Sequence, residues 1–259
     1  MPTHRRGPGV GSVPLRASDK YRRIRRARGL SLVGGVLLSV YIVRVLALSS
    51  RRQAAPTTVR RPGEHSMSDL SDHHLLETRL SSEVLCEGGF LKARRDTVRL
   101  PDGGTSTREY IIHPGAVVVI PLLDDDHVLL ERQFRYPVGR VMTEFPAGKL
   151  EPDEDPWLCA QRELLEETGY AAGQWAHAGD LHLAIAYSTE VIHVFFARDL
   201  RAGPRHLDVD EFLDTHALSD EAFFEACRRG GVTDAKTLSC ALWLQNVRSG
   251  AWALDWQLV

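Results

Sequence analysis

Three glutamates in one short segment have the spacing of a cation site. Glu163, Glu166 and Glu167 stand at positions i, i+3 and i+4, so a helix would carry all three carboxylates on one face. Like charges at this spacing repel one another by roughly 0.2–0.5 kcal/mol per pair. Mg²⁺ prefers carboxylate and carbonyl oxygens, and binding it would relieve that repulsion. A solvated acidic helix face is the alternative explanation of the same spacing.

The residues around these glutamates follow a longer pattern. Gly148 is followed after five residues by Glu154, and after seven more by Arg-Glu-Leu-Leu-Glu-Glu-Thr-Gly-Tyr at 162–170. This pattern resembles the Nudix box of the Nudix hydrolases at every fixed position, which favours catalysis over a plain acidic face. The resemblance implies an α+β fold, a Nudix-type α/β/α sandwich with an N-terminal β region. It also implies an enzyme that hydrolyses phosphorus-containing anhydrides, namely the diphosphate linkage between a nucleoside diphosphate and another group.

The same resemblance implies the metal ligands. Glu163 and Glu167 would be the chief ligands, Glu166 would share ligation or position water, and the backbone carbonyl of Ala147 would complete the set. The implied cofactor is Mg²⁺, with Mn²⁺ as a substitute. The cations would neutralise diphosphate charge, lower the pKa of bound water and hold water and leaving group in line.

The resemblance also implies positioning and basic residues. Arg162 would orient the glutamates, a task that suits a forked guanidinium, while Gly148 would permit the loop turn and Glu154 would link loop to helix. A separate carboxylate on a later loop would act as the general base. In the acidic stretch 208–211 we favour Glu211, with Asp210 next; the alternative is a plain acidic loop before a helix.

The flanking segments resemble the ADP-ribose (ADP-sugar) pyrophosphatase branch. The matching segments are residues 113–116, 131–136, 144–148, 187–190 and 234–237, so the resemblance covers about 75–248. It implies Arg135 as the phosphate-contacting arginine and Glu144 and Glu190 as further substrate-binding residues; an ordinary exposed strand arginine is the alternative for Arg135. One segment departs from the branch: Leu183–Ser188 lacks the proline that ADP-ribose hydrolases commonly carry there.

We therefore expect Mg²⁺-dependent hydrolysis of ADP-ribose to AMP and ribose 5-phosphate. The alternatives are another nucleoside diphosphate sugar, such as ADP-glucose or GDP-mannose, or a dinucleotide. Capped RNA, and nucleic acid in general, is disfavoured because residues 67–259 carry a formal charge of −14. A non-catalytic nucleotide sensor is a further alternative, but such domains usually lack box glutamates that are present here.

The elements expected to position these residues follow from local signals. Asp155 as N-cap, Pro156 at the first helical position and Gly169 past the end predict a helix that carries the glutamates. The turn at 101–104 predicts a hairpin. Further strands are expected at 117–123, 128–134, 181–185 and 191–197, and helices at 220–229 and 237–249.

The first 66 residues differ in composition from the rest. They hold 14 of the 32 basic and 2 of the 34 acidic residues, a formal charge of +12. We favour an upstream start assigned in error, with Met67 as the true one, because the composition changes there. The alternatives are a marginal membrane anchor, whose apolar run Leu30–Leu48 is interrupted by Arg44, and a basic binding arm.

Three segments result: the leader 1–66, an N-terminal β region 67–115, and a Nudix domain 116–259 with its box at 148–170. The resemblance implies a homodimer in which the N-terminal β region is exchanged between subunits. The four cysteines form no CxxC pair, which indicates reduced thiols of a cytoplasmic protein. We expect a nucleoside diphosphate sugar as substrate, and neither nucleic acid nor membrane as a partner.

Overall fold

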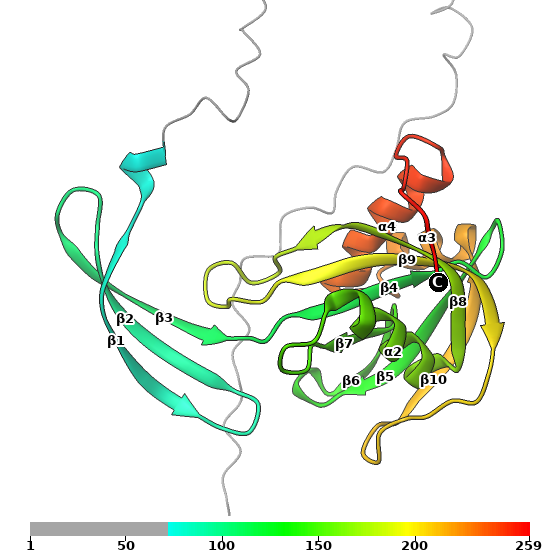
Figure 1. Cartoon of the computed structure of the whole chain (residues 1–259), viewed down its shortest axis with the longest axis horizontal. Coiled ribbons are helices and arrows are strands. Elements are labelled where there is room, and N and C mark those ends of the chain that lie inside the picture. The colour runs from blue at the N-terminus through cyan, green and yellow to red at the C-terminus, as the bar shows by residue number, and fades with distance from the viewer. Residues whose placement is uncertain (1–71) are drawn as a thin grey trace, which may run out of the picture. The chain divides into compact units, whose positions relative to one another are not determined.

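The computed structural model describes residues 72–259, so the three explanations of the leader concern residues outside this range. No helix within 72–259 has the length and apolar character needed to cross a membrane. A short 3₁₀ helix, η2 (Asp72–Leu75), begins the described part (Figure 1).

The N-terminal β region is a three-stranded antiparallel sheet of β1 (Thr78–Glu87), β2 (Lys92–Arg99) and β3 (Thr105–Ile112), in that order. The predicted hairpin is confirmed, since Arg99 pairs with Thr105 across the turn. Beyond β3, the N–H of Ile111 donates to the carbonyl of Tyr187 at 2.9 Å, and the N–H of Thr189 donates to the carbonyl of Ile111 at 3.0 Å. These bonds join the N-terminal sheet to the loop before β9 (Ile192–Ala202).

A five-stranded mixed sheet forms the centre of the Nudix region, in the order β11-β8-β9-β4-β7. Strand β4 (Ala116–Pro121) is buried along its whole length and lies parallel to β9. The remaining strands of this sheet are β7 (Ala147–Lys149), β8 (Tyr170–Leu181) and β11 (Gln257–Leu258). The continuous apolar run of β4 fits its place in the interior, where both faces are covered.

A second three-stranded sheet has the order β10-β5-β6. It consists of β5 (His127–Arg135), β6 (Arg140–Glu144) and β10 (Leu213–Ser219), with the 3₁₀ helix η3 (Tyr136–Val138) between β5 and β6. Glu131 of β5 pairs directly with Glu144 of β6, so two acidic residues stand side by side in this sheet.

Helices cover both faces of the central sheet, which confirms the α/β/α sandwich. Helix α2 (Pro156–Thr168) packs Cys159, Ala160 and Leu164 against Val117 and other residues on one face. Helices α3 (Asp220–Arg229) and α4 (Ala235–Arg248) contribute to the apolar cluster on the opposite face. The chain order can be followed in Figure 1 by its colours.

The end signals of α2 act as predicted. The Asp155 side chain accepts a hydrogen bond from the N–H of Trp157 at 2.8 Å, and Gly169 closes the helix in the left-handed conformation at φ 75°. The predicted helix 220–229 coincides with α3, and α4 begins two residues earlier than predicted.

One predicted strand is wrong. The strand expected at 181–185 ends at Leu181, and the chain is extended instead over the preceding β8. Between His177 and Gly179 the pairing with β9 shifts register, because a β-bulge adds one residue to β8. The bulge breaks the two-residue alternation by which a strand is read from sequence.

Candidate active site

Strand β7 and helix α2 bring a glutamate directly onto a glycine. A Cβ added to Gly148 would lie 1.9 Å from the carboxyl carbon of Glu163, far inside contact distance. Gly148 lies within β7 and is not among the glycines with positive φ. Close approach of Glu163, rather than the loop turn implied by the resemblance, therefore accounts for glycine here.

Arg162 is the centre of the ion-pair network on α2. Its Nε donates to Glu154 at 2.8 Å, and its Nη1 donates to Glu163 at 2.9 Å and to Glu166 at 3.0 Å. Its Nη2 reaches the other oxygen of Glu154 at 2.9 Å. The hydrogen bonds that Arg162 donates to Glu154 hold the pKa of Glu154 at about 2, and the same bonds are the largest cause of the raised pKa of Arg162. Arg162 thus joins loop and helix in one charged network.

Glu163 remains hard to ionise despite this guanidinium. Its pKa is raised to about 7, chiefly because it is buried, with the charges of Glu166 and Glu211 adding to the effect of burial. Arg162 opposes the rise. A cation close to Glu163 would lower this pKa again and stabilise the carboxylate.

Glu167 and Glu131 form the deepest part of the cluster. Glu167 is 3% exposed and Glu131 is fully buried. The N–H of Ala147 donates to Glu167 at 3.0 Å, which ties the end of α2 to the start of β7. Burial, then the charge of Glu131, raises the pKa of Glu167 well above its usual range. Burial, then the charge of Glu144, raises the pKa of Glu131 to about 8.

Glu144 is held by two cations. Arg135 makes a bidentate pair with it, at 2.8 Å through Nε and 3.0 Å through Nη2, and Lys236 of α4 also contacts it. Burial acts to raise the pKa of Glu144, but these hydrogen bonds and charges outweigh it and the pKa lies below its usual value. Lys236 also pairs with Asp234, the N-cap of α4, at 3.1 Å.

The other predicted residues lie as follows. Gln133 of β5 donates to Glu211 at 3.3 Å, and the charge of Glu211 acts on both Glu163 and Glu167, so the later loop reaches the cluster. Glu190 lies 3.5 Å from His113. Glu190 is thus paired with the segment that follows β3 in the chain.

Two residues of this site were missed by the sequence reasoning. Glu131 and Lys236 lay in segments noted for their resemblance, without a role of their own. A signal for Glu131 was available, since it follows Val128, Leu129 and Leu130 in a buried apolar strand. A charge in such a run indicates a functional or paired group. Lys236, the second residue of α4, carried no comparable signal.

The donor set of this cluster fits divalent cations. Both oxygens of Glu131 are buried without a basic, amide or hydroxyl donor within residues 72–259, and their polar neighbour is a second carboxyl group, that of Glu167. Glu131, Glu163 and Glu167 have pKa values raised by burial and by the charges of neighbouring carboxylates. An all-oxygen set of partly dehydrated carboxylates is the environment that Mg²⁺ and Mn²⁺ accept.

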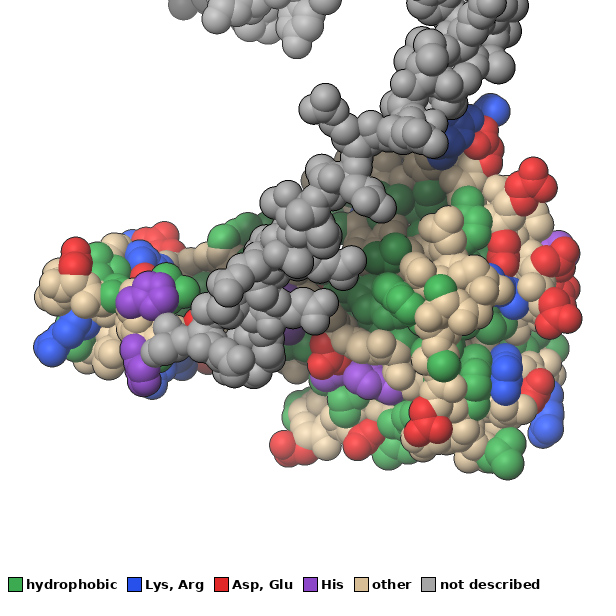
Figure 2. Space-filling view, turned by 90° about the horizontal axis from the view of Figure 1, so that it is seen from above, with side chains coloured by type: hydrophobic (Ala, Val, Ile, Leu, Met, Phe, Trp, Pro, Cys, Tyr) green, Lys and Arg blue, Asp and Glu red, His purple; other side chains and the backbone are tan. Residues whose placement is uncertain are grey.

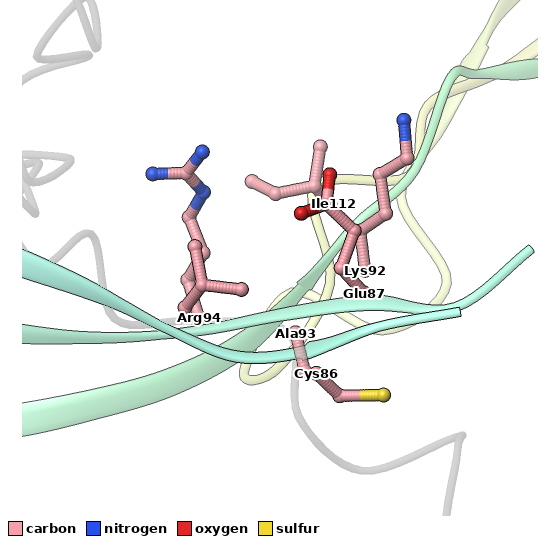
Figure 3. Close-up of a pocket in the computed structure, with 7 residues that line it drawn as sticks. Cys86, Glu87, Lys92, Ala93, Arg94 and Ile112 are labelled. Carbon is pink, nitrogen blue, oxygen red and sulfur yellow. The ribbon is translucent and has the colours of Figure 1, made fainter. Parts of the chain in front are cut away.

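A pocket of about 220 Å³ lies elsewhere, on the N-terminal sheet. Figure 3 shows Glu87, Lys92, Arg94 and Ile112 directed toward the same side of this sheet. Its lining residues all belong to β1, β2 and β3. The pocket is therefore separate from the carboxylate cluster.

Residues 112–229 match the NUDIX domain, and residues 77–111 match the nucleoside diphosphate sugar hydrolase N-terminal domain. The ADP-ribose pyrophosphatase of Bacillus subtilis (strain 168) is 36% identical over 173 residues, which cover 66% of this chain and 94% of that relative. The chain belongs to the Nudix hydrolase family. This Nudix hydrolase is also 35% identical to the methanol dehydrogenase activator of Bacillus methanolicus. That match spans 171 residues, which cover 65% of this chain and 92% of that relative.

The fold of this Nudix hydrolase is also found in a solved structure. A crystal structure of ADP compounds hydrolase superposes with a TM-score of 0.62 at 22% sequence identity. The match covers 68% of this chain and 97% of that chain. At this identity the likeness concerns the fold, and it agrees with the sandwich derived above.

Proposed function

We propose that this Nudix hydrolase cleaves the diphosphate linkage of ADP-ribose with the help of Mg²⁺, giving AMP and ribose 5-phosphate. The buried cluster of Glu131, Glu163 and Glu167 carries the proposal, because its donor set suits divalent cations and the charge of Arg135 acts on it. The relative named ADP-ribose pyrophosphatase and the matched nucleoside diphosphate sugar hydrolase N-terminal domain support this choice of substrate.

The chain's own residues divide the work in this mechanism. Glu163, Glu166, Glu167 and the carbonyl of Ala147 would hold Mg²⁺, which supplies charge neutralisation and activation of water when bound. Arg162 fixes the orientation of Glu163 and Glu166 through its hydrogen bonds. Orientation of this kind lowers the barrier because the reacting groups are already in place.

Glu211 acts as general base in the proposal. The hydrogen bond from Gln133 orients the Glu211 carboxylate on the loop that precedes β10. Glu211 accepts a proton from water as the water oxygen bonds to phosphorus and the bridging P–O bond breaks. Asp210 is the neighbouring candidate for the same role.

Arg135 and Glu190 contact the substrate in this proposal, and Glu144, which is buried, takes part by holding Arg135 in position. Arg135 is held against Glu144 through Nε and Nη2, its side chain is 39% exposed, and we assign its Nη1 to a diphosphate oxygen. Glu190, beside His113, lies on the loop that is hydrogen-bonded to β3, where it can accept from a ribose hydroxyl.

We propose further that the enzyme is a homodimer formed through the N-terminal β region. This region exposes large apolar side chains, with fractions of 42–64%: Leu75, Leu76, Leu80, Val84, Leu85, Phe90 and Leu91. Figure 2 shows apolar side chains among acidic and basic ones over this part of the chain. Exposed apolar surface of this extent is typical of an interface.

The free cysteines Cys86, Cys159, Cys227 and Cys240 support a reducing compartment, the cytoplasm.

The test is hydrolysis by the full chain in Mg²⁺, with ADP-ribose, ADP-glucose, GDP-mannose and diadenosine diphosphate at equal concentration and chromatography of the products. We expect AMP and ribose 5-phosphate from ADP-ribose as the fastest reaction. Glu167→Gln should reduce it by about 10³-fold. Glu225→Gln, an exposed carboxylate of α3 paired only with Arg228 and Arg229 in the described structure, is the matched control and should leave the rate unchanged.

Each other outcome changes a different part of the proposal. Faster release from another sugar nucleotide would keep the carboxylate chemistry and overturn the substrate. Full activity in Glu167→Gln would overturn the assignment of the cluster. Binding of nucleotide without turnover would favour the non-catalytic sensor.

A further inference from the structure

A second group of metal-ligating side chains lies on β8 and β9. The Nδ1 atom of His193 lies 2.8 Å from Oδ1 of Asp180, and the Nε2 atom of His177 lies 3.1 Å from the same oxygen. The three ligand atoms all lie within 4.8 Å of one another. Two imidazoles from neighbouring strands therefore converge on a single carboxylate oxygen.

The bulge in β8 creates this convergence. His177 and Asp180 are three residues apart, so a regular strand would direct them to opposite faces of the sheet. The register shift between His177 and Gly179 returns Asp180 to the face of His177 and places it opposite His193. Gly179 at the bulge has φ 148°, a conformation that favours glycine.

Packing holds the bulge and the imidazoles in place. The indole N–H of Trp243 in α4 donates to the carbonyl of Ala178, the residue between His177 and Gly179, at 3.2 Å. The ring of His177 packs on Phe195, with centroids 5.2 Å apart. The cluster is thus anchored from both faces of the central sheet, and its orientation does not depend on a loop.

Two of the three separations, those between nitrogen and oxygen, are close to the spacing in a tetrahedral metal site. Zn²⁺ binds imidazole nitrogen and carboxylate oxygen at about 2.0–2.2 Å, so neighbouring ligands of a tetrahedral ion are about 3.3 Å apart. The two measured N–O separations differ from this by a few tenths of an ångström. Two nitrogens and one oxygen also favour Zn²⁺ and similar transition metals over Mg²⁺.

The accessibility of the group suits a metal ion. The side chains of His177, Asp180 and His193 are 46%, 44% and 25% exposed. An ion can enter from solvent, and water can provide the fourth ligand.

This group is separate from the catalytic carboxylates. His193 pairs with Val117 of β4, and Val117 pairs with Gly148 of β7. Two strand spacings therefore lie between His193 and Gly148, about 10 Å between their Cα atoms. Glu163, which packs on Gly148, and His193 belong to two different sites on the α2 face of the sheet.

We propose that His177, Asp180 and His193 bind one transition-metal ion of the Zn²⁺ class, distinct from the catalytic Mg²⁺. The bound ion cross-links β8 to β9 at the end where the chain leaves for the loop 182–191. It stabilises the folded protein because the unfolded chain lacks the bulge that brings the three ligands together.

Equilibrium dialysis of the full chain against Zn²⁺ in excess Mg²⁺, which competes for the carboxylates, tests this proposal. We expect one Zn²⁺ per chain, and an affinity at least 30-fold lower in the double variant His177→Gln/His193→Gln. Co²⁺ in place of Zn²⁺ should give visible absorption bands that the double variant loses. The matched control is His127→Gln, since His127 lies 2.9 Å from Asp124 and 2.8 Å from Asp126 in a group with a single imidazole.

A second variant separates the two sites. Glu163→Gln should retain the Zn²⁺ affinity of the unsubstituted chain. Zn²⁺ binding that persists in the double variant, or that is lost in Glu163→Gln or His127→Gln, would overturn the proposal. Circular dichroism of the double variant checks that it is folded, and the Co²⁺ bands of Asp180→Asn, a smaller change, provide an independent readout.

Discussion

The N-terminal sheet and the catalytic region differ in where their charged side chains lie: they are exposed in the sheet and buried in the catalytic region. In the sheet, Arg95 pairs with Glu83 and Glu109, and all three side chains are 42–59% exposed. In the catalytic region, Glu131 and Glu144 stand side by side in the interior. Exposed pairs contribute little to stability, whereas buried like charges must be balanced by cations. The protein therefore places unfavourable electrostatics where a ligand can offset them.

Replacing the buried lysine should have the largest effect. Lys236→Met removes one of the two cations that hold Glu144 and leaves Arg135 as the other. A buried charge that loses its partner costs about 3–5 kcal/mol in the free energy of unfolding, so we expect a loss of up to about this size. Arg95→Met in the N-terminal sheet removes a comparable number of contacts and should have a far smaller effect. Urea unfolding of both variants measures the difference; equal losses would contradict the contrast between the two regions.

Substitutions at two glycines compare a closely packed position in the catalytic region with an open position in the N-terminal sheet. In Gly148→Ala the new methyl group would displace Glu163, and a shift of about 1 Å in a catalytic group costs about 10²-fold in rate. Gly89→Ala, in the turn between β1 and β2, meets no heavy atom within 4 Å and should retain full activity. Steady-state hydrolysis rates decide between them, and an active Gly148→Ala enzyme would show that Glu163 is not held as described.

Stability without metal should decrease as the pH rises. The pKa values of Glu163 and Glu131 are raised from 4.5 to about 7 and about 8, so between pH 4.5 and 8 the folded protein binds more protons than the unfolded chain. The stability linked to these protons is complete below pH 4.5 and is lost toward pH 8. Mg²⁺ should therefore raise Tm more at pH 8 than at pH 5.5, by about 5 °C.

Differential scanning fluorimetry with Mg²⁺ or with a chelator measures this difference. In Glu163→Gln, the contribution of this carboxyl to the pH dependence of the Mg²⁺ effect on Tm should disappear. A Mg²⁺ effect of the same size at both pH values would mean that these carboxyls are already ionised in the metal-free protein.

The smallest expected effect concerns association through the N-terminal sheet. Val84→Lys puts a charge among the exposed apolar residues of β1 and should weaken the proposed dimer about tenfold. Val209→Lys, at a residue that is fully exposed in the loop before β10, is the matched control. Sedimentation analysis over a range of concentrations compares the two, and an unchanged monomer–dimer equilibrium in Val84→Lys would place the interface elsewhere.

Local sequence signals were sufficient to predict the parts of the site that depend on interactions between residues close together in the chain. The N-cap Asp155 and the terminal Gly169 set the bounds of α2, and the helical period then placed Glu163, Glu166 and Glu167 together. These interactions lie within a few residues of one another, so no knowledge of the tertiary structure was required.

The remaining parts depend on distant contacts. Lys236 reaches Glu144 across 92 positions of the chain, and no local pattern reports such a pair. No strand with bounds of its own was predicted at 170–181, because β8 is rich in alanine and glycine and its bulge interrupts the alternation of faces. The same bulge assembles His177 with Asp180, so the feature that concealed the strand also created the proposed second metal site.

The burial of β4 should also slow the exchange of its amide hydrogens with water. Its six residues are hydrogen-bonded to β9 on one edge and, over 116–118, to β7 on the other, and none is exposed to solvent. Amide hydrogens in such a strand exchange with water only when the whole domain opens, whereas the exposed β1 exchanges through local fluctuations. Gly148 and the start of the catalytic loop are paired with this buried segment, so we expect the site to keep its geometry during brief local openings of the exposed strands.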